Sequence, residues 1–160
     1  MSRKRENVRQ CKAIRQLIDD NKYTKALELI DAIPLEEVGS LDDLYRYAEL
    51  YEKAERMDKK KEIFYHIYHR THSRYMLNRL LRLTIRMGDM EEARELYFAY
   101  EVAGPITLDT FELRYLLAKA EGEPPERLIQ ILEELKKEEY TEEWGFRLAC
   151  LYEKLSLIHI

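Results

Sequence analysis

The feature that most constrains this chain is a sequence pattern that returns every 33 or 34 residues. Aligning the chain with itself brings five positions into register at intervals of 34, 33, 34 and 33, namely Gln10, Leu44, Leu77, Phe111 and Trp144. Large residues follow most of these positions three, four and seven places later. A fixed period of this length is typical of a supersecondary unit that is stacked on copies of itself. The pattern therefore favours a repeat architecture over a closed helical bundle.

Within each period the apolar spacing is helical. Apolar residues recur three and four places apart, and valine occurs only at Val8, Val38 and Val102, so the alternation expected of strands is missing. Start signals such as Ser40, Asp89 and Thr107 precede several of the segments. The sequence predicts an all-α chain of nine helices over residues 4–20, 23–33, 41–56, 59–70, 73–87, 90–103, 108–121, 125–139 and 142–155.

The third period carries the most specific motif. It reads Leu77-x2-Leu80-Leu81, then Gly88-Asp89 in the turn, Ala93-x3-Tyr97 in the second helix and Pro105 at the end. This resembles the tetratricopeptide repeat, a 34-residue helix–turn–helix unit. Matching pieces in the other periods are Ala26-x3-Ile30, Tyr47-Ala48-x2-Tyr51 and the Trp144 start. The chain resembles a divergent, bacterial-type member of this family.

The resemblance implies a right-handed α-solenoid of about four and a half helix pairs. A single helix pair cannot bury its own apolar face, so neighbouring pairs stack and share a core. The expected repeats cover residues 7–40, 41–73, 74–107, 108–140 and 141–154, the last of them incomplete. Two repeats depart from the family pattern, because Lys60-Lys61 and Arg127-Leu128 replace the small residue of the second helix.

Composition narrows the class of protein. The chain has 160 residues, 46% of them hydrophobic, and a formal net charge of −4, and it has no apolar run long enough to cross a membrane. Its two cysteines, Cys11 and Cys150, match no paired metal or redox spacing, and no apolar signal segment opens the sequence. We therefore expect a cytoplasmic protein without a membrane segment.

One stretch stands out chemically, because no acid occurs between Glu62 and Asp89. The same stretch contains Arg70, Arg74, Arg79, Arg82 and Arg86, and the last three share one side of a helix. The family resemblance implies further groove-facing positions. The candidate partner-binding set is Arg15, Tyr45, Arg46, Glu49, Asn78, Arg79, Arg82 and Arg86.

Guanidinium groups suit carboxylates and phosphates, which leaves several partners open. We expect a protein-interaction scaffold that binds a peptide or helix, an acidic one in particular, on the concave face. One alternative is an RNA-binding helical-repeat protein, although the net charge and the acidic last third argue against nucleic acid. Others are a peptide-responsive regulatory module of a longer protein, and a basic helix face that binds nothing.

Neither catalysis nor a cofactor is expected. The sequence has no Gly-rich phosphate loop, no nucleophile elbow and no zinc-protease motif. His66, His69 and His72 recur every three residues, but no carboxylate or thiol lies near enough in sequence to complete a metal site. We interpret them as surface histidines beside Tyr65 and Tyr68.

The last residues suggest that the chain is a fragment. The fifth repeat has a first helix but no second helix to cover Trp144, Leu148 and Leu151, so an open apolar face and self-association through it are expected. Residues 155–160 read like a translated sequencing adapter, which predicts a non-native tail. The native part would then be residues 1–154 of a longer protein.

Overall fold

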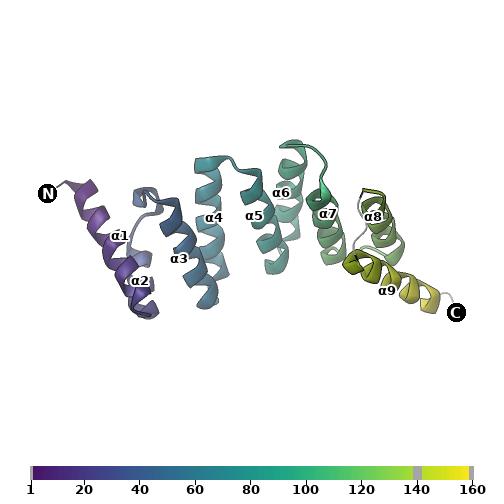
Figure 1. Ribbon diagram of the computed structural model, residues 1–160, viewed down its shortest axis with the longest axis horizontal. Coiled ribbons are helices and arrows are strands. Elements are labelled where there is room, and N and C mark those ends of the chain that lie inside the picture. Colours follow the sequence, from purple (N-terminus) through teal and green to yellow (C-terminus); the bar gives the residue numbers. More distant parts are fainter. Residues whose placement is uncertain (1, 139–141, 159–160) are drawn as a thin grey trace. The chain divides into compact units, whose positions relative to one another are not determined.

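The computed structural model describes residues 2–138 and 142–158, with the side chains of all of these except 138, 143, 144 and 155–158. The described residues form nine α-helices and one short 3-10 helix, and they contain no strand (Figure 1). The elements in chain order are α1 (Arg3–Asp19), α2 (Tyr23–Ala32), η1 (Leu35–Glu37), α3 (Leu41–Lys53), α4 (Met57–Thr71), α5 (Arg74–Met87), α6 (Met90–Val102), α7 (Leu108–Ala120), α8 (Pro125–Glu138) and α9 (Glu142–Ile158).

All nine predicted helices are present, and most of their ends lie within one or two residues of the prediction. The larger differences are that α3 ends at Lys53, three residues before the predicted end, and that α9 continues to Ile158, three residues beyond it. The segment η1 was not predicted. The side chains of Trp144 and of the predicted tail, residues 155–160, lie outside the described part of the chain.

The four turns inside the helix pairs share one backbone geometry, and this explains the period. A residue with positive φ follows the first helix of each pair, at Asn21 (58°), Glu55 (58°), Gly88 (83°) and Gly122 (75°). The next amide donates to the carbonyl oxygen five residues back in every case, from Lys22 to Leu17, from Arg56 to Tyr51, from Asp89 to Thr84 and from Glu123 to Ala118. This is the Schellman arrangement that satisfies free carbonyl groups at a helix end. The intervals between these residues, 34, 33 and 34, repeat the sequence period.

The predicted start signals are seen at three helices. The Ser40 hydroxyl accepts from the Asp43 amide at 3.4 Å, and the Asp89 carboxylate accepts from the Glu92 amide at 3.2 Å. The Thr107 amide donates to the Thr110 hydroxyl at 3.0 Å. These bonds satisfy amides that a helix leaves unpaired at its start.

The chain forms two compact bodies, residues 1–76 and 77–160, which we call the N-terminal and C-terminal bodies. In the N-terminal body, α1 packs on α2, α2 on α3 and α3 on α4 (Figure 1). Its core contains large side chains from the register positions, with Leu44 and Tyr47 fully buried. The small residue Ala26 is also fully buried, which allows α2 to pack closely against its neighbours.

The departure at Lys60 is accommodated by pairing its charge. Lys60 occupies the register position of Ala26 and Ala93, and it is buried although it is a lysine. Its Nζ lies 3.0 Å from Glu52 Oε2 and 5.2 Å from the centroid of the Phe64 ring. A buried ammonium requires such partners, because burial without them is costly. In α8, Arg127 is exposed and Leu128 is buried.

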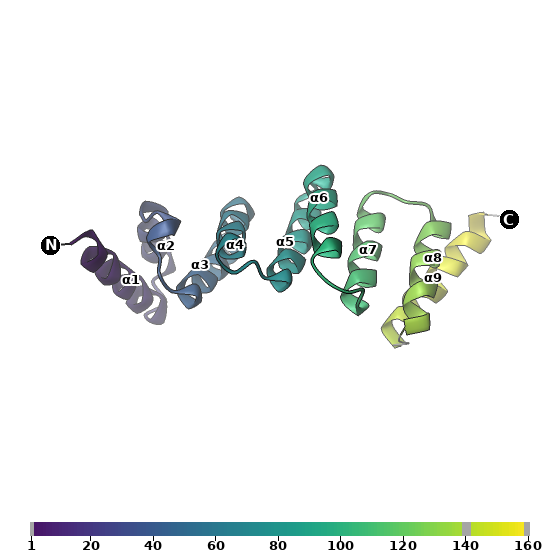
Figure 2. The same cartoon turned by 90° about the horizontal axis from the view of Figure 1, so that it is seen from above.

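In the C-terminal body the helices α7, α8 and α9 share one core. Phe111 and Tyr115 from α7 pack with Leu128, Ile131, Leu132 and Leu135 from α8, and α9 lies beside α8 (Figure 2). Leu148 and Leu151 are buried in this core and do not form an open face. Among the described side chains of α9, the large apolar ones that are exposed are Phe146, with 72% of its surface accessible, and Tyr152, with 46%.

Candidate protein-binding surface

In the N-terminal body, Arg15 bridges the first helices of two successive repeats. Its Nε and Nη2 each donate to Asp43 at 2.7 Å, so the contact between α1 and α3 is bidentate. The Asp43 side chain is 3% exposed, whereas that of Arg15 is 45% exposed. The hydrogen bond to Asp43 and its negative charge raise the pKa of Arg15. In the free chain Arg15 is therefore already engaged, with part of its guanidinium open to solvent.

A pocket of about 220 Å³ lies beside this pair, and we call it the first-helix pocket. The α1 side of the pocket is formed by one helix face that includes Lys4, Val8, Cys11 and Lys12, and the opposite side by residues 37, 39, 40 and 43. Lys4 and Lys12 are exposed, and neither forms a hydrogen bond or an ion pair with another described residue. The pocket therefore carries positive charge that the chain itself does not neutralise.

The hydroxyl of Tyr47 is buried near two residues of this pocket, Cys11 and Asp43. Tyr47 is fully buried, and its hydroxyl makes no hydrogen bond within the described part of the chain. Burial, together with the neighbouring Cys11 and Asp43, raises the pKa of Tyr47, so the hydroxyl keeps its proton at neutral pH. Tyr47 was part of the repeat motif in the sequence and was not among the predicted binding residues.

The other candidates of this body lie apart from Arg15. Arg46 and Glu49 line a separate pocket of about 210 Å³ together with Asp19, Tyr23 and Lys53, while Tyr45 is half-buried. Both Arg46 and Glu49 are exposed. Of the four binding residues predicted in the N-terminal body, Arg15 lines the first-helix pocket, Arg46 and Glu49 line the other pocket, and Tyr45 is half-buried.

In the C-terminal body, Asn78 and Arg82 belong to one polar network. Arg82 Nε donates to Asn78 Oδ1 at 2.6 Å, and its Nη1 and Nη2 each lie 3.3 Å from an oxygen of Glu112 on α7. Asn78 is buried. Arg82 therefore links the first helices α5 and α7, much as Arg15 links α1 and α3. Its guanidinium is committed to the chain before any partner binds.

Arg79 and Arg86 complete the predicted arginine face of α5. Arg79 is half-buried and Arg86 is exposed, and each of them interacts with other residues of the chain. The positions between them that face inward, Leu80, Leu81 and Thr84, are buried. The predicted sharing of one helix side is therefore consistent with the burial pattern of α5.

A network centred on Arg114 of α7 was not expected from the sequence. Its Nε donates to the Tyr97 hydroxyl at 2.6 Å, its Nη2 donates to Glu101 at 3.0 Å, and Nη1 lies 3.7 Å from Glu134. The guanidinium carbon lies 5.3 Å from the centroid of Phe111. A signal existed, since Arg114 stands at a register position that Tyr47 and Leu80 occupy in other repeats.

Of the three histidines, His69 in α4 and His72 just after it lie beside aromatic rings, whereas His66 is half-buried and not at the surface as expected. The His69 ring lies 6.2 Å from Tyr65 and 5.7 Å from Tyr68, measured between centroids. His72 ends the helix in a left-handed conformation with φ of 50°, in the turn where the sequence placed it. Within residues 2–138 and 142–158 no three potential ligands come together in a metal-binding group. No helix of this part is long and apolar enough to cross a bilayer.

Comparison with known proteins identifies the fold. No family model matches the sequence, and no curated protein matches it. Among solved structures, the chain is similar to a candidate kinesin light chain of Podospora anserina, described as having nearly identical TPR-like repeats, with 17% sequence identity and a TM-score of 0.56. The match covers 98% of this chain and 90% of that one. The expected tetratricopeptide-type architecture is thus confirmed at the level of the fold, and the chain is a TPR-like α-solenoid.

Proposed function

We propose that this chain is a protein-interaction scaffold whose first helices bind an acidic peptide or helix of a partner protein. A TPR-like fold is generally a scaffold for protein–protein interaction. The observation that carries the acidic preference is the first-helix pocket, where Lys4 and Lys12 have no partner within the described chain. Carboxylates of a partner would neutralise both lysines, and charge of this kind also accelerates association.

The arginine face of α5 supplies a second region of positive charge in this proposal. Arg79 and Arg86 are the residues that a partner would contact there, whereas Asn78 and Arg82 position the helix through Glu112. Arg15 has the same positioning role through Asp43, with its exposed part at the pocket. Tyr45, Arg46 and Glu49 remain proposed contacts for the flanks of the peptide. In this proposal the chain is not an enzyme and needs no cofactor.

A peptide-binding assay with matched charge reversals tests the proposal. The probes are fluorescent peptide pools of equal length, one rich in Asp and Glu, one rich in Lys and Arg and one neutral, with a single-stranded RNA as a fourth probe. We expect the acidic pool to bind most tightly and its affinity to fall as salt screens the lysines. Lys12→Glu should weaken binding about threefold or more, since it replaces an attractive charge by a repulsive one.

The matched controls are lysines on second helices. Lys25→Glu in α2 is the control for Lys12→Glu, and Lys137→Glu in α8 is the control for Arg86→Glu, a second variant on the proposed face. Each control lies away from that face and changes the net charge by the same amount as its variant. Both controls should bind the acidic pool with the affinity of the unchanged chain, apart from the loss that the more negative net charge causes. Equal weakening by variants and controls, or preference for RNA over the acidic peptides, would contradict the proposal.

Self-association through α9 is a further part of the proposal. Its support is the exposed ring of Phe146, since exposed aromatic side chains often mark contact surfaces. Light scattering after gel filtration should show a mass that rises with protein concentration, and Phe146→Ser should remove that rise. A mass independent of concentration argues against this contact.

We propose the cytoplasm as the location, consistent with the free thiols of Cys11 and Cys150.

A further inference from the structure

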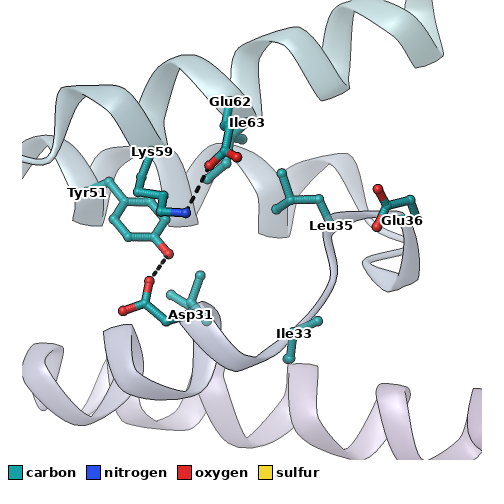
Figure 3. A pocket seen from close by; sticks show the side chains of 9 residues that line it. Asp31, Ile33, Leu35, Glu36, Tyr51, Lys59, Glu62 and Ile63 are labelled. Carbon is teal, nitrogen blue, oxygen red and sulfur yellow. Dashed lines mark hydrogen bonds and ion pairs between the residues drawn. The ribbon is translucent and has the colours of Figure 1, made fainter.

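A second pocket of the N-terminal body lies between the second helices and differs in charge from the first-helix pocket. It has a volume of about 230 Å³ and is bounded by α2, η1 and α4, with Tyr51 of α3 at its base (Figure 3). We call it the second-helix pocket. Ile30, Ile33, Tyr51 and Ile63 line its inner wall and are each less than a tenth exposed, so this wall is held in place by the core.

The rim of this pocket is acidic. Three carboxylates, those of Asp31, Glu36 and Glu62, line it together with one ammonium, that of Lys59. The Asp31 carboxylate accepts from the Tyr51 hydroxyl at 2.5 Å and pairs with Arg56 at 2.8 Å. Glu62 pairs with Lys59 at 3.1 Å. Figure 3 shows the contacts of Tyr51 with Asp31 and of Lys59 with Glu62 as dashed lines, with Glu36 on η1 apart from them.

Glu36 is the rim carboxylate that no cation of the described chain pairs with, and its charge acts on His66. It is exposed, and it forms neither a hydrogen bond nor an ion pair with a described residue. Since the charges of Asp31 and Glu62 are matched by Arg56 and Lys59, the negative charge available to a ligand lies at the η1 end of the pocket. Leu35, half-buried, lies beside Glu36 and lines the same pocket.

We propose that the second-helix pocket binds one lysine or arginine side chain of a partner protein. The aliphatic stem would pack on Leu35 and Ile63 while the cationic head meets Glu36, which is the usual way in which long basic side chains bury a stem and keep the charge at a polar edge. A volume of about 230 Å³ suits one side chain, because pockets for whole small molecules start at about 300 Å³.

This site is independent of the proposed acidic-peptide face. The first-helix pocket is lined by α1 and the start of α3, whereas the second-helix pocket is lined by α2, η1 and α4 with one residue of α3. The two pockets carry opposite charge, so a single ligand chemistry does not fit both. A partner that uses both pockets needs an acidic segment for one and a basic residue for the other.

Amide NMR of the full chain, titrated with the N-acetyl methylamide of arginine, tests the inference. We expect saturable shifts at Leu35, Glu36 and Ile63, with the lysine derivative acting in the same way. Glu36→Gln should weaken binding about threefold, the effect of one exposed charge pair. Glu28→Gln is the matched control, because Glu28 is an exposed carboxylate of α2 that does not line the pocket.

Three outcomes would overturn the inference. They are equal binding of the glutamate or the norleucine derivative, shifts that lie away from the residues lining the pocket, and unchanged affinity in Glu36→Gln. A titration of Lys12→Glu separates this site from the proposed function, since that variant should bind acidic peptides more weakly and bind the arginine derivative as the unchanged chain does. Loss of both activities in Lys12→Glu would show that the two sites are one.

Discussion

Arg15 and Asp43 are joined by two hydrogen bonds of 2.7 Å across α1 and α3, and only the arginine side of the pair reaches solvent. The Asp43 carboxylate is almost fully buried. Replacing it with the amide of asparagine removes the negative charge that pairs with the Arg15 guanidinium and leaves an uncharged group in its place. Asp43→Asn should lower the free energy of unfolding in urea by about 1–2 kcal/mol, less than for a fully buried pair because Arg15 is partly hydrated.

Asp42→Asn is the control for this prediction. Asp42 is also an acid in the first turn of α3, but it is exposed. Its loss removes only a favourable charge near the helix start, worth a few tenths of a kcal/mol. Equal destabilisation by both variants would show that the Arg15–Asp43 contact adds nothing beyond the helix dipole.

The recurring turn predicts opposite effects at equivalent positions. Glu55 and Gly88 both hold positive φ after the first helix of a pair, but only Gly88 does so without steric cost. Glu55→Gly should stabilise the chain by about 0.5–1 kcal/mol, because relief of the strained conformation outweighs the added freedom of the unfolded state. Gly88→Ala should destabilise it by about 1 kcal/mol, and since no atom lies within 4 Å of the added Cβ, the loss reflects φ alone.

Thermal unfolding of both turn variants checks this prediction, with Gly39→Ala as a control. Gly39 has no atom within 4 Å of an added Cβ and does not hold positive φ. Its replacement should be neutral or slightly stabilising. Destabilisation by Glu55→Gly would mean that the side chain of Glu55 matters more than its backbone conformation.

The buried Lys60 gives a third prediction. Lys60 is paired with Glu52, so Glu52→Gln leaves a buried ammonium without its counter-charge and should cost about 1–2 kcal/mol. Lys60→Met keeps the stem and removes the charge, and it should be neutral or stabilising. Lys59→Met is the matched control, since Lys59 is 40% exposed and pairs with the exposed Glu62. Urea unfolding that shows Lys60→Met to be the more damaging change would contradict this account.

The fold could be predicted further than the site, for a physical reason. Helix periodicity and turn chemistry act over a few residues, so the sequence predicted all nine helices and the turn at Gly88. The link from Arg82 to Glu112 spans 30 residues, and that from Arg114 to Glu134 spans 20. Such pairs depend on how helices pack, which a local pattern does not encode. The sequence therefore predicted Arg15 and Arg82 as binding residues, whereas the structure gives them partners within the chain.

The short segment η1 shows the same limit. Pro34, Gly39 and Ser40 predicted an interruption between helices, and the 3-10 turn at Leu35–Glu37 lies within it. What the sequence does not show is that Arg70 of α4 donates to the carbonyl oxygens of Val38 and Gly39. This contact fixes the segment against α4, and it brings Glu36 near His66.

His66 makes the stability of the N-terminal body sensitive to mild acid. Its Nε2 is buried without a hydrogen-bond partner in the described chain. Burial lowers the pKa of His66, and the charges of Arg70 and His69 lower it further while that of Glu36 raises it. The unfolded chain therefore takes up the proton first, so His66 favours the fold above about pH 6.5 and this contribution is lost as the pH falls. Urea unfolding between about pH 7.5 and pH 5 should show a loss of stability that His66→Gln reduces.

Arg70→Gln should raise the pKa of His66 in an NMR titration, and Glu36→Gln should lower it. A His66 pKa at or above that of a histidine in an unfolded peptide would refute this assignment.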